Sequence, residues 1–349
     1  MTNDSPAPTA RKPFTSRSGR VLDFSSLGFG TAPLGNLYRA ISNEQALQTM
    51  QQAWALGIRY YDTAPLYGFG LAETRLGAFL REMPRDEYLL STKVGRVLQR
   101  SAPEQRDGIG KFFDVPSRQM GYDYSYDGVM RSLDFSYERL GLDRIDIALC
   151  HDLCVFTHGS QQASDQSTRE FLDGGYRALA ELRDQGLIGA IGIGVNEWQV
   201  SEVVARNTEV DLFLLAGRYT LLEQESLNSF LPLVQQKKMG VIIGGPFNSG
   251  ILATGAREGA WFNYGPAPAE VLEKVAAIEE ICLAHGVPLR DAALQFPLLH
   301  PAVVNVIPGA ITPEEARGNV ASMNRAIPPA LWKDLVSQGL LREDAPHAR

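Results

Sequence analysis

Residues 58–95 read IRYYDTAPLYGFGLAETRLGAFLREMPRDEYLLSTKVG and contain the unit from which the fold can be inferred. An apolar, strand-like segment (58–64) is followed by a helix-like segment (71–81) and then by a second strand-like segment (87–95). A strand, a helix and a strand in this order predict two parallel strands joined by a crossover helix.

The same alternation continues on both sides of this unit. Further strand-like segments lie at 27–32, 144–152, 187–196, 211–218, 240–246 and 302–310. Further helix-like segments lie at 43–56, 126–141, 168–186, 197–207, 223–238, 268–285, 289–299 and 313–324. Ser42 is the expected N-cap of the first of these helices, and Gly57 is its expected stop. Eight apolar strands that alternate with helices predict an α/β protein built as a single-domain (β/α)8 TIM barrel.

A Rossmann domain is the alternative architecture for alternating strands and helices. It requires a glycine fingerprint at a strand–helix turn, with an acidic residue at the end of the next strand. The nearest candidate, GFGTAPLG (28–35), lacks the spacing, and no acidic residue ends a second strand in a suitable context. The barrel is therefore favoured.

The boundaries of the barrel follow from the same pattern. We expect a flexible N-terminal tail over residues 1–19, the barrel over 20–340, and a flexible C-terminal tail over 341–349. Long loops follow the third strand (96–125) and the fourth strand (153–167). Loops after barrel strands lie on the face that carries active sites, so both are candidate walls of a pocket. The first loop carries several side chains suited to binding a polyol, although a solvated surface loop is the alternative: Arg106, Asp107, Tyr122, Asp123 and Tyr124.

The composition narrows the classes of function. The chain has 349 residues, of which 44% are hydrophobic, and its net charge of −7 argues against nucleic acid as a partner. No apolar run is long enough to cross a bilayer and residues 1–20 have no apolar signal core, so we expect a cytoplasmic protein without membrane partners. The three cysteines have no framework spacing, which favours a reducing compartment. Cys150 and Cys154 flank His151, but no second pair has zinc spacing, so no metal is expected.

Four polar residues stand at or just after the expected C-terminal ends of successive strands. Asp62 ends the second strand, Tyr67 lies in the loop that follows it, Lys93 ends the third strand and His151 ends the fourth. Any one of them could be an ordinary surface residue, but four together at the mouth of a barrel indicate a site. A lysine lowers the pKa of a nearby tyrosine by stabilising its phenolate, an aspartate holds the lysine, and a histidine can orient a substrate oxygen. Such a tyrosine can exchange a proton with a hydroxyl or carbonyl oxygen, as hydride transfer to or from a cofactor requires.

The sequence resembles the aldo-keto reductases over residues 20–325. The resemblance rests on LGFGTAPLG, GIRYYDTAPLYGFGLAETRLG, LLSTKVG, the strand that ends in CHD, and VIPGAITPEEARGN. It implies that Asp62, Tyr67, Lys93 and His151 form the catalytic tetrad of that family. It also implies a nicotinamide cofactor bound in an extended form over the barrel mouth, without a Rossmann domain.

The resemblance assigns contacts near the nicotinamide, with Asp62 counted among them. Gly30 and Thr31 match residues beside the nicotinamide ribose, and Asn196 matches the asparagine that holds the carboxamide, although this chain reads GIGVN where the family commonly has GVSN. The segment GGPFNSGIL (244–252) resembles the pyrophosphate loop, although a plain turn is the alternative. Its candidate contacts are Gly244, Pro246, Ser249 and Gly250, and Gly244 stands where a tyrosine usually stacks on the nicotinamide.

The segment GAITPEEARGN (309–319) resembles the adenosine site, with candidate contacts Gly309, Thr312, Glu315, Arg317 and Asn319. Thr312 and Pro313 look like the N-cap and first residue of a helix, which would leave free amides for a phosphate. Asn319 matches the adenine-binding asparagine, whereas Arg317 either lies along the adenine or is a solvated helix residue. Relatives that use NADP have a Lys and an Arg where this chain has Gly309 and Glu315, so NAD is expected in preference to NADP.

Within the family, GTAPLGNLYR and the glycine-rich fifth and seventh strands are most similar to a bacterial sugar-dehydrogenase branch. Its activities include L-fucose dehydrogenase and D-threo-aldose 1-dehydrogenase. The similarity implies an enzyme that transfers hydride from the C1 hemiacetal carbon of an aldose to NAD and yields a lactone. Pyridoxal 4-dehydrogenase, which converts pyridoxal to 4-pyridoxolactone, is the near alternative. An alternative of another class is a regulatory subunit that binds a nicotinamide cofactor. The sequence has no evident segment for docking a partner, which argues against this alternative.

Overall fold

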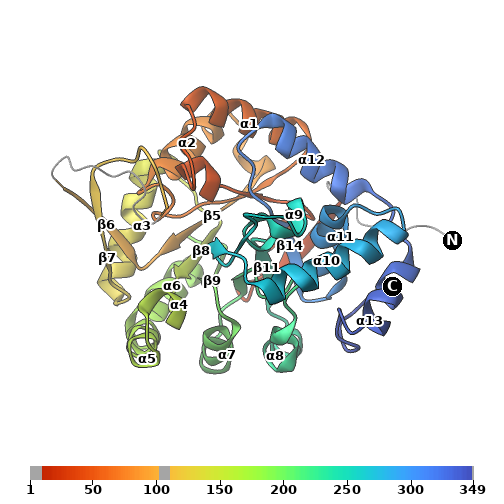
Figure 1. Cartoon of the computed structure of the whole chain (residues 1–349). Coiled ribbons are helices and arrows are strands. Elements are labelled where there is room, and N and C mark those ends of the chain that lie inside the picture. The colour runs from red at the N-terminus through yellow and green to blue at the C-terminus, as the bar shows by residue number, and fades with distance from the viewer. Residues whose placement is uncertain (1–9, 102–110, 348–349) are drawn as a thin grey trace.

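The computed structural model describes residues 10–101 and 111–347 of the chain. Eight parallel strands form one sheet, in which strands that follow one another along the chain are hydrogen-bonded neighbours. They are β3 (Phe29–Gly30), β4 (Tyr60–Asp62), β5 (Leu89–Val94), β8 (Ile147–His151), β9 (Ala190–Val195), β10 (Leu212–Ala216), β11 (Gly240–Gly244) and β14 (Val303–Ile307). Bridges from Leu27 to Val306 and from Gly30 to Gly309 join the first strand to the last. The predicted barrel is confirmed, as Figure 1 shows.

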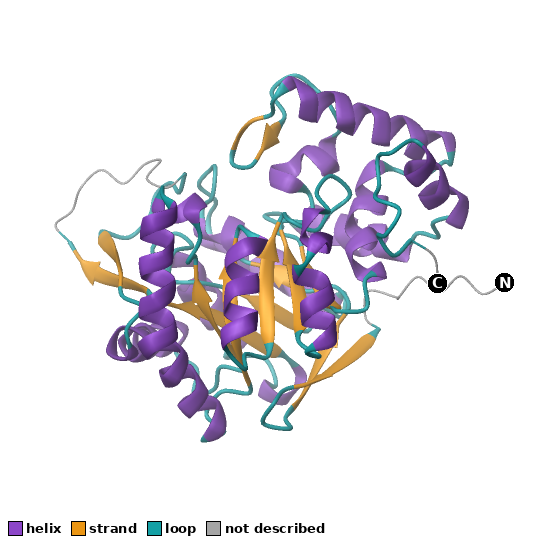
Figure 2. Ribbon diagram, turned by 90° about the horizontal axis from the view of Figure 1, so that it is seen from below, coloured by secondary structure: helices purple, strands orange, loops and turns teal. Residues whose placement is uncertain are grey.

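Helices follow the strands and surround the barrel (Figures 1 and 2). The longer ones are α1 (Asn43–Ala55), α2 (Leu71–Leu80), α3 (Tyr126–Leu140), α5 (Gln161–Glu170), α6 (Tyr176–Asp184), α7 (Trp198–Asn207), α8 (Phe230–Gln236), α10 (Ala269–Ala284), α11 (Leu289–Gln295), α12 (Pro313–Asn324) and α13 (Pro329–Ser337). The short ones are α4 (Val155–His158), α9 (Ile251–Thr254) and the 3-10 helices Ala32–Gly35, Arg85–Glu87, Glu225–Asn228, Asn248–Gly250 and Phe296–Leu299. Within the described ranges, no helix combines the length and apolarity needed to cross a membrane.

The first barrel helix shows why these elements form where they do. The side chain of Ser42 accepts a hydrogen bond from the amide of Gln45 at 3.1 Å, which satisfies one free donor of the first turn. At the other end, Gly57 adopts a left-handed φ of 88°, which a glycine tolerates without strain. Both predicted ends of this helix are confirmed.

Side chains alternate along the strands between the barrel interior and the surrounding helices. Tyr60, Ile147 and Leu149 belong to the interior cluster, whereas Tyr61 packs in the outer core under the helices. Because the side-chain period of a strand is two residues, the inward positions continue to Asp62 on β4 and to His151 on β8. The strands therefore aim two of the predicted catalytic side chains into the mouth of the barrel.

The N-terminal hairpin closes the opposite end of the barrel. β1 (Arg11–Thr15) pairs antiparallel with β2 (Val21–Ser25). Leu22 and Phe24 of β2 are fully buried in the interior cluster. The predicted tail over residues 1–19 is thus wrong for residues 11–15, because their strand is held by β2; residues 1–9 lie outside the described residues.

The C-terminal boundary also differs from the prediction. Leu341 and Ala345 are buried, and the amide of Arg342 donates to the side chain of Gln224 at 3.3 Å. The packed chain therefore continues past residue 340. The buried residues Leu341, which follows Leu340, and Ala345 stand in a short and mostly polar segment, which has no periodicity that a sequence analysis can detect.

The two long loops contain secondary structure that the sequence did not predict. The first holds an antiparallel hairpin of β6 (Arg96–Arg100) and β7 (Arg118–Tyr122), while Arg106 and Asp107 lie outside the described residues. The second is mostly helical, because α5 starts at Gln161 and continues through a π-helical segment, Phe171–Gly175, into α6. Ser160 caps α5 by accepting from the amide of Ala163. A third hairpin, β12 (Trp261–Phe262) with β13 (Gly265–Pro266), follows the seventh barrel strand.

Candidate active site

Three of the four predicted catalytic residues meet around one ammonium group. Lys93 Nζ donates to Asp62 Oδ2 at 2.7 Å, to the carbonyl oxygen of Thr63 at 2.9 Å and to Tyr67 Oη at 3.0 Å. Lys93 and Asp62 are each 1% exposed. The three protons of the ammonium thus all have partners, and the buried charge is paired with a carboxylate.

The backbone that carries Tyr67 is pressed against the loop after the first strand. A Cβ on Gly35 would lie 2.5 Å from the backbone carbon of Tyr67, and one on Gly68 would lie 2.4 Å from the carbonyl oxygen of Gly35. Gly68 also has a left-handed φ of 65°. Two glycines facing each other therefore allow the close backbone approach that seats the phenol beside Lys93.

Asp62 has a second set of partners inside the barrel. Ser91 Oγ donates to Asp62 Oδ1 at 2.7 Å, and Tyr60 Oη lies 2.8 Å from the same Ser91 oxygen. Since Ser91 donates its proton to the carboxylate, Tyr60 is the donor to Ser91. Burial raises the pKa of Asp62, but Lys93 and these hydrogen bonds oppose that rise.

His151 lies beside the tyrosine at the end of β8. Its ring is edge-on to the ring of Tyr67, with the centroids 6.0 Å apart. His151 Nε2 is 3.2 Å from Asp152 Oδ2, and Arg96 Nη2 donates to the same oxygen at 2.5 Å. Burial lowers the pKa of His151 well below its ordinary value, so the imidazole is neutral at physiological pH.

The ionisation of Tyr67 differs from the expectation that Lys93 lowers its pKa. Burial raises the pKa of Tyr67 well above its ordinary value, and the carboxylates of Asp62 and Asp152 raise it further, while Arg96 opposes them. The phenol therefore carries its proton at neutral pH in the free site. The sequence showed the nearby lysine, but it did not show the depth of burial or the second carboxylate.

A cavity of about 460 Å³ opens beside these residues at the C-terminal ends of the strands. Asp62 and Tyr67 line it, together with most of the predicted cofactor contacts: Gly30, Asn196, Gly244, Pro246, Ser249, Gly250, Gly309 and Glu315. Thr31, Lys93, His151, Thr312, Arg317 and Asn319 are not among its lining residues. Segments from six different strand ends are thus brought together at one opening, as the barrel requires.

Two predicted contacts at the nicotinamide end are occupied by the protein itself. Thr31 is fully buried and its hydroxyl donates to the carbonyl oxygen of Asp62 at 2.9 Å, so this side chain fixes the first strand against the second. Asn196 follows β9, and its Nδ2 donates to Asp152 Oδ1 at 3.2 Å. Its Oδ1 accepts from Tyr264 Oη at 3.3 Å.

The expected free amides at the adenosine end are capped within the chain. Thr312 accepts from the amide of Glu315 at 3.1 Å, and the Glu315 carboxylate accepts from the amide of Ile311 at 2.8 Å. The Thr312 side chain thus satisfies the amide of Glu315, one of the donors expected to remain free for a phosphate. The sequence TPEE contains the capping-box signature, which could have indicated this arrangement.

Arg317 and Asn319 are also held by neighbouring side chains. Arg317 Nη1 donates to Gln52 at 2.5 Å and its Nη2 pairs with Glu314, so the solvated-helix interpretation of Arg317 fits these contacts. Asn319 Oδ1 accepts from Arg290 at 3.2 Å. Arg290 had not been singled out, because an arginine on an apparently ordinary helix carries no recognisable motif.

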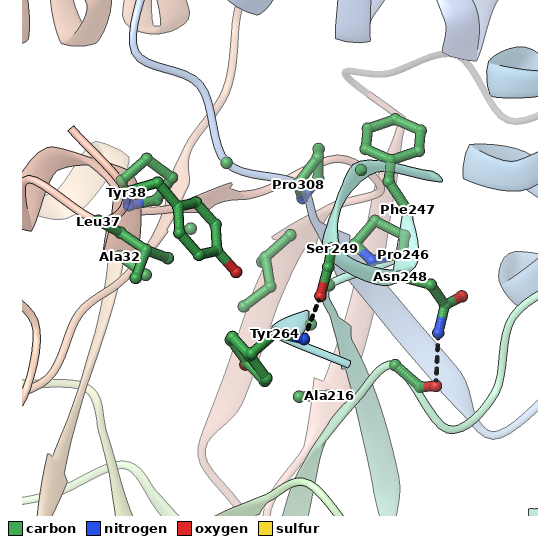
Figure 3. A pocket seen from close by; sticks show the side chains of 18 of the residues that line it. Ala32, Leu37, Tyr38, Ala216, Pro246, Phe247, Asn248, Ser249, Tyr264 and Pro308 are labelled. Carbon is green, nitrogen blue, oxygen red and sulfur yellow. Dashed lines mark hydrogen bonds between the residues drawn. The ribbon is translucent and has the colours of Figure 1, made fainter. Parts of the chain in front are cut away.

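Tyr264 is the main lining residue that the sequence analysis missed (Figure 3). Its backbone amide donates to Ser249 Oγ at 3.0 Å, which ties the β12–β13 turn to the loop after the seventh strand. Figure 3 also shows Tyr38, whose hydroxyl is directed toward Ser249. Asn263 and Tyr264 have left-handed φ values of 49° and 64°, an uncommon conformation that often accompanies function. In the sequence, only the pair Asn-Tyr before Gly-Pro in WFNYGP indicates the turn that carries Tyr264.

The cavity suits a nicotinamide dinucleotide. Asn248 lines it and is only 4% exposed, because its Nδ2 donates to the carbonyl oxygen of Gly217 at 3.0 Å and so fixes this part of the wall. Part of the wall is backbone that no side chain could replace, because a Cβ on Gly309 would lie 2.5 Å from Pro33 Cγ. Tyr67 and Asn196, from the predicted nicotinamide end, line the same cavity as Gly309 and Glu315, from the predicted adenosine end. One cavity therefore connects the two predicted ends of the cofactor site.

Comparisons with known proteins agree with this architecture. The chain is 42% identical over 330 residues to a pyridoxal 4-dehydrogenase of Microbacterium luteolum, covering 92% of this chain and 95% of that protein. It is 39% identical over 325 residues to a D-threo-aldose 1-dehydrogenase of a Pseudomonas species, with the same two coverages. The solved holo form of an aldo-keto reductase from Bacillus halodurans superposes with a TM-score of 0.72 at 25% identity, over 95% of this chain and 96% of that one.

Residues 26–338 match the model of the aldo/keto reductase family, which covers nearly all of the barrel. That family consists of oxidoreductases that use a nicotinamide cofactor and act on small molecules. The barrel, the cavity and the cluster around Lys93 agree with the match. The chain therefore belongs to the aldo/keto reductase family.

Proposed function

We propose that this protein is an NAD-dependent dehydrogenase that oxidises the C1 hemiacetal carbon of an aldose, such as L-fucose or a D-threo-aldose, to a lactone. One observation carries the proposal: the phenol oxygen of Tyr67 lies at the cavity wall, 3.0 Å from Lys93 Nζ. A cation at that distance stabilises a phenolate, which is the form that accepts a proton. The 39% identical D-threo-aldose 1-dehydrogenase supports a sugar as the substrate.

The residues of this chain then take the following roles. Tyr67 accepts the proton of the anomeric hydroxyl while the C1 hydrogen leaves with its electron pair and the C1–oxygen bond becomes double. Lys93 stabilises the phenolate and Asp62 holds Lys93 in place. His151 orients the substrate oxygen as a neutral imidazole. The bound nicotinamide would supply the acceptor for the hydride.

Several residues of the cavity are candidates to hold that cofactor. Asn196 and Asn248 line the cavity together with Tyr67, and the backbone of residues 244–250 forms one wall. Glu315 lines the cavity at the other end, where its carboxylate would repel a 2′-phosphate. Arg317, a cation on the same helix as Glu315, is engaged by Gln52 and Glu314. These contacts support NAD over NADP.

A second candidate substrate is pyridoxal, whose cyclic hemiacetal would be oxidised to 4-pyridoxolactone by the same chemistry. Two aromatic side chains, Tyr38 and Tyr264, line the cavity and offer flat surfaces to a pyridine ring. The 42% identity to a pyridoxal 4-dehydrogenase also favours this candidate.

The test is a steady-state assay of the purified protein with NAD or NADP and a panel of L-fucose, D-threo-aldoses, other aldoses and pyridoxal. We expect turnover with NAD and a lactone that has lost two hydrogens, identified by mass spectrometry. Turnover of pyridoxal alone would replace the sugar assignment by the second candidate. Nicotinamide binding without turnover of any substrate would contradict both and favour a regulatory role.

A further inference from the structure

Asn196 stands between the cavity and a buried ion pair. It follows β9, lines the cavity and is half-buried. Its side-chain amide has a partner at each end, because Nδ2 donates to Asp152 Oδ1 at 3.2 Å and Oδ1 accepts from Tyr264 Oη at 3.3 Å. The nitrogen of an amide can only donate and its oxygen can only accept. The direction of this amide therefore decides which kind of group it offers to a ligand.

The Asp152 carboxylate is held in place by the chain around it. Arg96 Nη2 donates to Asp152 Oδ2 at 2.5 Å, and both side chains are buried. The backbone amide of Asp152 donates to the carbonyl oxygen of Gly194 at 2.9 Å. Burial would raise the pKa of Asp152, but His151 and Arg96 outweigh burial and hold it below its ordinary value. The group is therefore an ionised carboxylate, which can only accept hydrogen bonds.

The two partners of the Asn196 amide make different demands on its direction. Burial raises the pKa of Tyr264, so its hydroxyl is neutral, and a neutral hydroxyl can meet either end of an amide because it both donates and accepts. The carboxylate of Asp152 can meet only the nitrogen, since Oδ1 turned toward it would place two acceptors in contact. Asp152 thus fixes the direction of the amide and turns Oδ1 to the Tyr264 side.

An acceptor position remains on this oxygen. A carbonyl oxygen has two lone pairs, of which the Tyr264 hydroxyl uses one. Asn196 and Tyr264 both line the cavity, so the second lone pair is available to a ligand that carries a donor. Asp152 is not among the lining residues, so its effect on such a ligand passes through Asn196.

A nicotinamide ring carries a matching donor close to its reacting carbon. Its carboxamide is attached to the ring carbon next to the one that accepts the hydride, so it must lie near the reacting groups of the protein. Asn196 is near those groups, because its partner Asp152 has Oδ2 3.2 Å from His151 Nε2, and the ring of His151 is edge-on to that of Tyr67. The NH2 of the carboxamide is thus the donor that suits Asn196 Oδ1.

We propose that Asp152 is a positioning residue that turns the oxygen of the Asn196 amide toward the cavity and so selects the NH2 group of a nicotinamide carboxamide. The inference rests on the proposed function only in that a nicotinamide dinucleotide occupies the cavity. It does not depend on which substrate is oxidised.

Asp152→Asn should reverse the direction of the Asn196 amide. Arg96 offers only donors, so in this variant it holds the one remaining side-chain oxygen of residue 152. The new NH2 group then faces Asn196 and requires an acceptor, so Asn196 Oδ1 turns toward it. As a consequence Nδ2 turns toward the cavity, which now offers a donor in place of an acceptor.

The test compares two dinucleotides that differ in one donor. In the acetylpyridine analogue of NAD a methyl group replaces the NH2 of the carboxamide, while the carbonyl group is retained. The Kd of each is measured by calorimetry with the full-length protein and no substrate. We expect the wild type to bind NAD about tenfold more tightly than the analogue, which leaves Asn196 Oδ1 without its donor. Asp152→Asn should bind both with nearly equal Kd values, because the turned amide donates to the carbonyl that they share. Equal Kd values in the wild type, or the wild-type ratio in the variant, would overturn the proposal.

Two control variants separate the direction of the amide from other effects. Tyr264→Phe removes the other partner of Asn196 and should keep the wild-type ratio of Kd values, since Asp152 remains. Glu73→Gln alters another buried pair, in which Glu73 lies 2.5 Å from Arg139, and should also keep the ratio. Loss of the ratio in Tyr264→Phe would assign the preference to the hydroxyl, and loss in Glu73→Gln would assign it to general stability. Either result would overturn the role of Asp152.

A charge-neutral variant covers the case in which Asp152→Asn does not fold because the charge of Arg96 is left uncompensated. Arg96→Met/Asp152→Leu removes both buried charges together. Without a group that directs it, the Asn196 amide can turn to suit either dinucleotide, so the ratio should fall toward one, and the wild-type ratio would overturn the proposal. A wild type that binds neither dinucleotide would contradict the proposed function and this inference with it. Binding of NAD without a preference over the analogue would overturn this inference alone.

Discussion

Lys93 contacts Tyr67 in two ways, since its ammonium nitrogen lies 3.0 Å from the phenol oxygen and 4.6 Å from the centroid of the ring. The cation is thus close both to the charge of a phenolate and to the electron-rich face of the ring. Burial and two carboxylates favour the neutral phenol instead, and together they raise the pKa of Tyr67. The balance between these effects sets the pH at which the tyrosine can accept a proton.

Oxidation of the substrate should become faster with increasing pH. Because the pKa of Tyr67 is raised, the phenolate fraction is small at neutral pH and grows through the alkaline range. Lys93→Met removes the stabilising cation, so the rising limb of kcat/KM should move to still higher pH. The measurement is kcat/KM against pH for the wild type, for Lys93→Met and for the remote variant Lys237→Met. A profile that is identical in all three would show that Lys93 does not tune the tyrosine. Thermal unfolding should be recorded beside it, because the change also leaves Asp62 buried without its partner.

Tyr67→Phe should lower turnover at least ~100-fold, because it removes the proposed proton acceptor. Binding of NAD, followed by the quenching of protein fluorescence, should be nearly unchanged. Tyr61→Phe is the control, since Tyr61 is fully buried and its hydroxyl donates to the carbonyl oxygen of Ile58 outside the barrel interior. Near-normal turnover in Tyr67→Phe would remove this residue from its role.

The preference for NAD should be at least ~10-fold in kcat/KM, or about 1.4 kcal/mol. Glu315 lines the cavity, so Glu315→Gln should raise the efficiency with NADP while changing that with NAD much less. Glu314→Gln is the control, because Glu314 is its neighbour but pairs with Arg317 and does not line the cavity. Equal kcat/KM values of the wild type with NAD and NADP would contradict the preference for NAD. Equal effects of Glu315→Gln and Glu314→Gln would show that the preference does not depend on Glu315.

Tyr264 should influence the choice between a sugar and pyridoxal. Tyr264→Ala removes an aromatic wall of the cavity, so we expect the ratio of kcat/KM for pyridoxal to that for the best aldose to fall by about tenfold, a loss comparable to one aromatic contact. Tyr264→Phe retains the ring and removes only the hydrogen bond to Asn196, so it should preserve the ratio. If both variants leave the ratio unchanged, the aromatic wall does not select the substrate.

The sequence was sufficient for the barrel and for the cluster around Lys93. Apolar strand segments and recognisable helix ends are local patterns, so the sequence alone predicts these elements. Asp62, Lys93 and His151 stand at strand ends, which a barrel brings together. Asn196 and Glu315 were found through the family resemblance, and both line the cavity.

Other parts of the site depend on contacts between distant segments. Tyr264 reaches Asn196 across 68 residues of sequence, and Arg96 reaches Asp152 across 56. The raised pKa of Tyr67 results first from burial and then from the carboxylates of Asp62 and Asp152. Such quantities belong to the packed structure, so no local pattern of residues could have revealed them.

The N-terminal hairpin imposes an order on the synthesis and folding of the chain. Leu22 and Phe24 share the barrel interior with Val304 and Ile307, which the ribosome adds some 280 residues later. Until the eighth strand emerges, these two apolar side chains lack their final partners. Exposed apolar side chains and unpaired strand edges make an incompletely folded chain prone to aggregation. Leu22 and Phe24 are thus made long before their partners in the barrel interior, so the yield of folded protein should be especially sensitive to substitutions at these two residues.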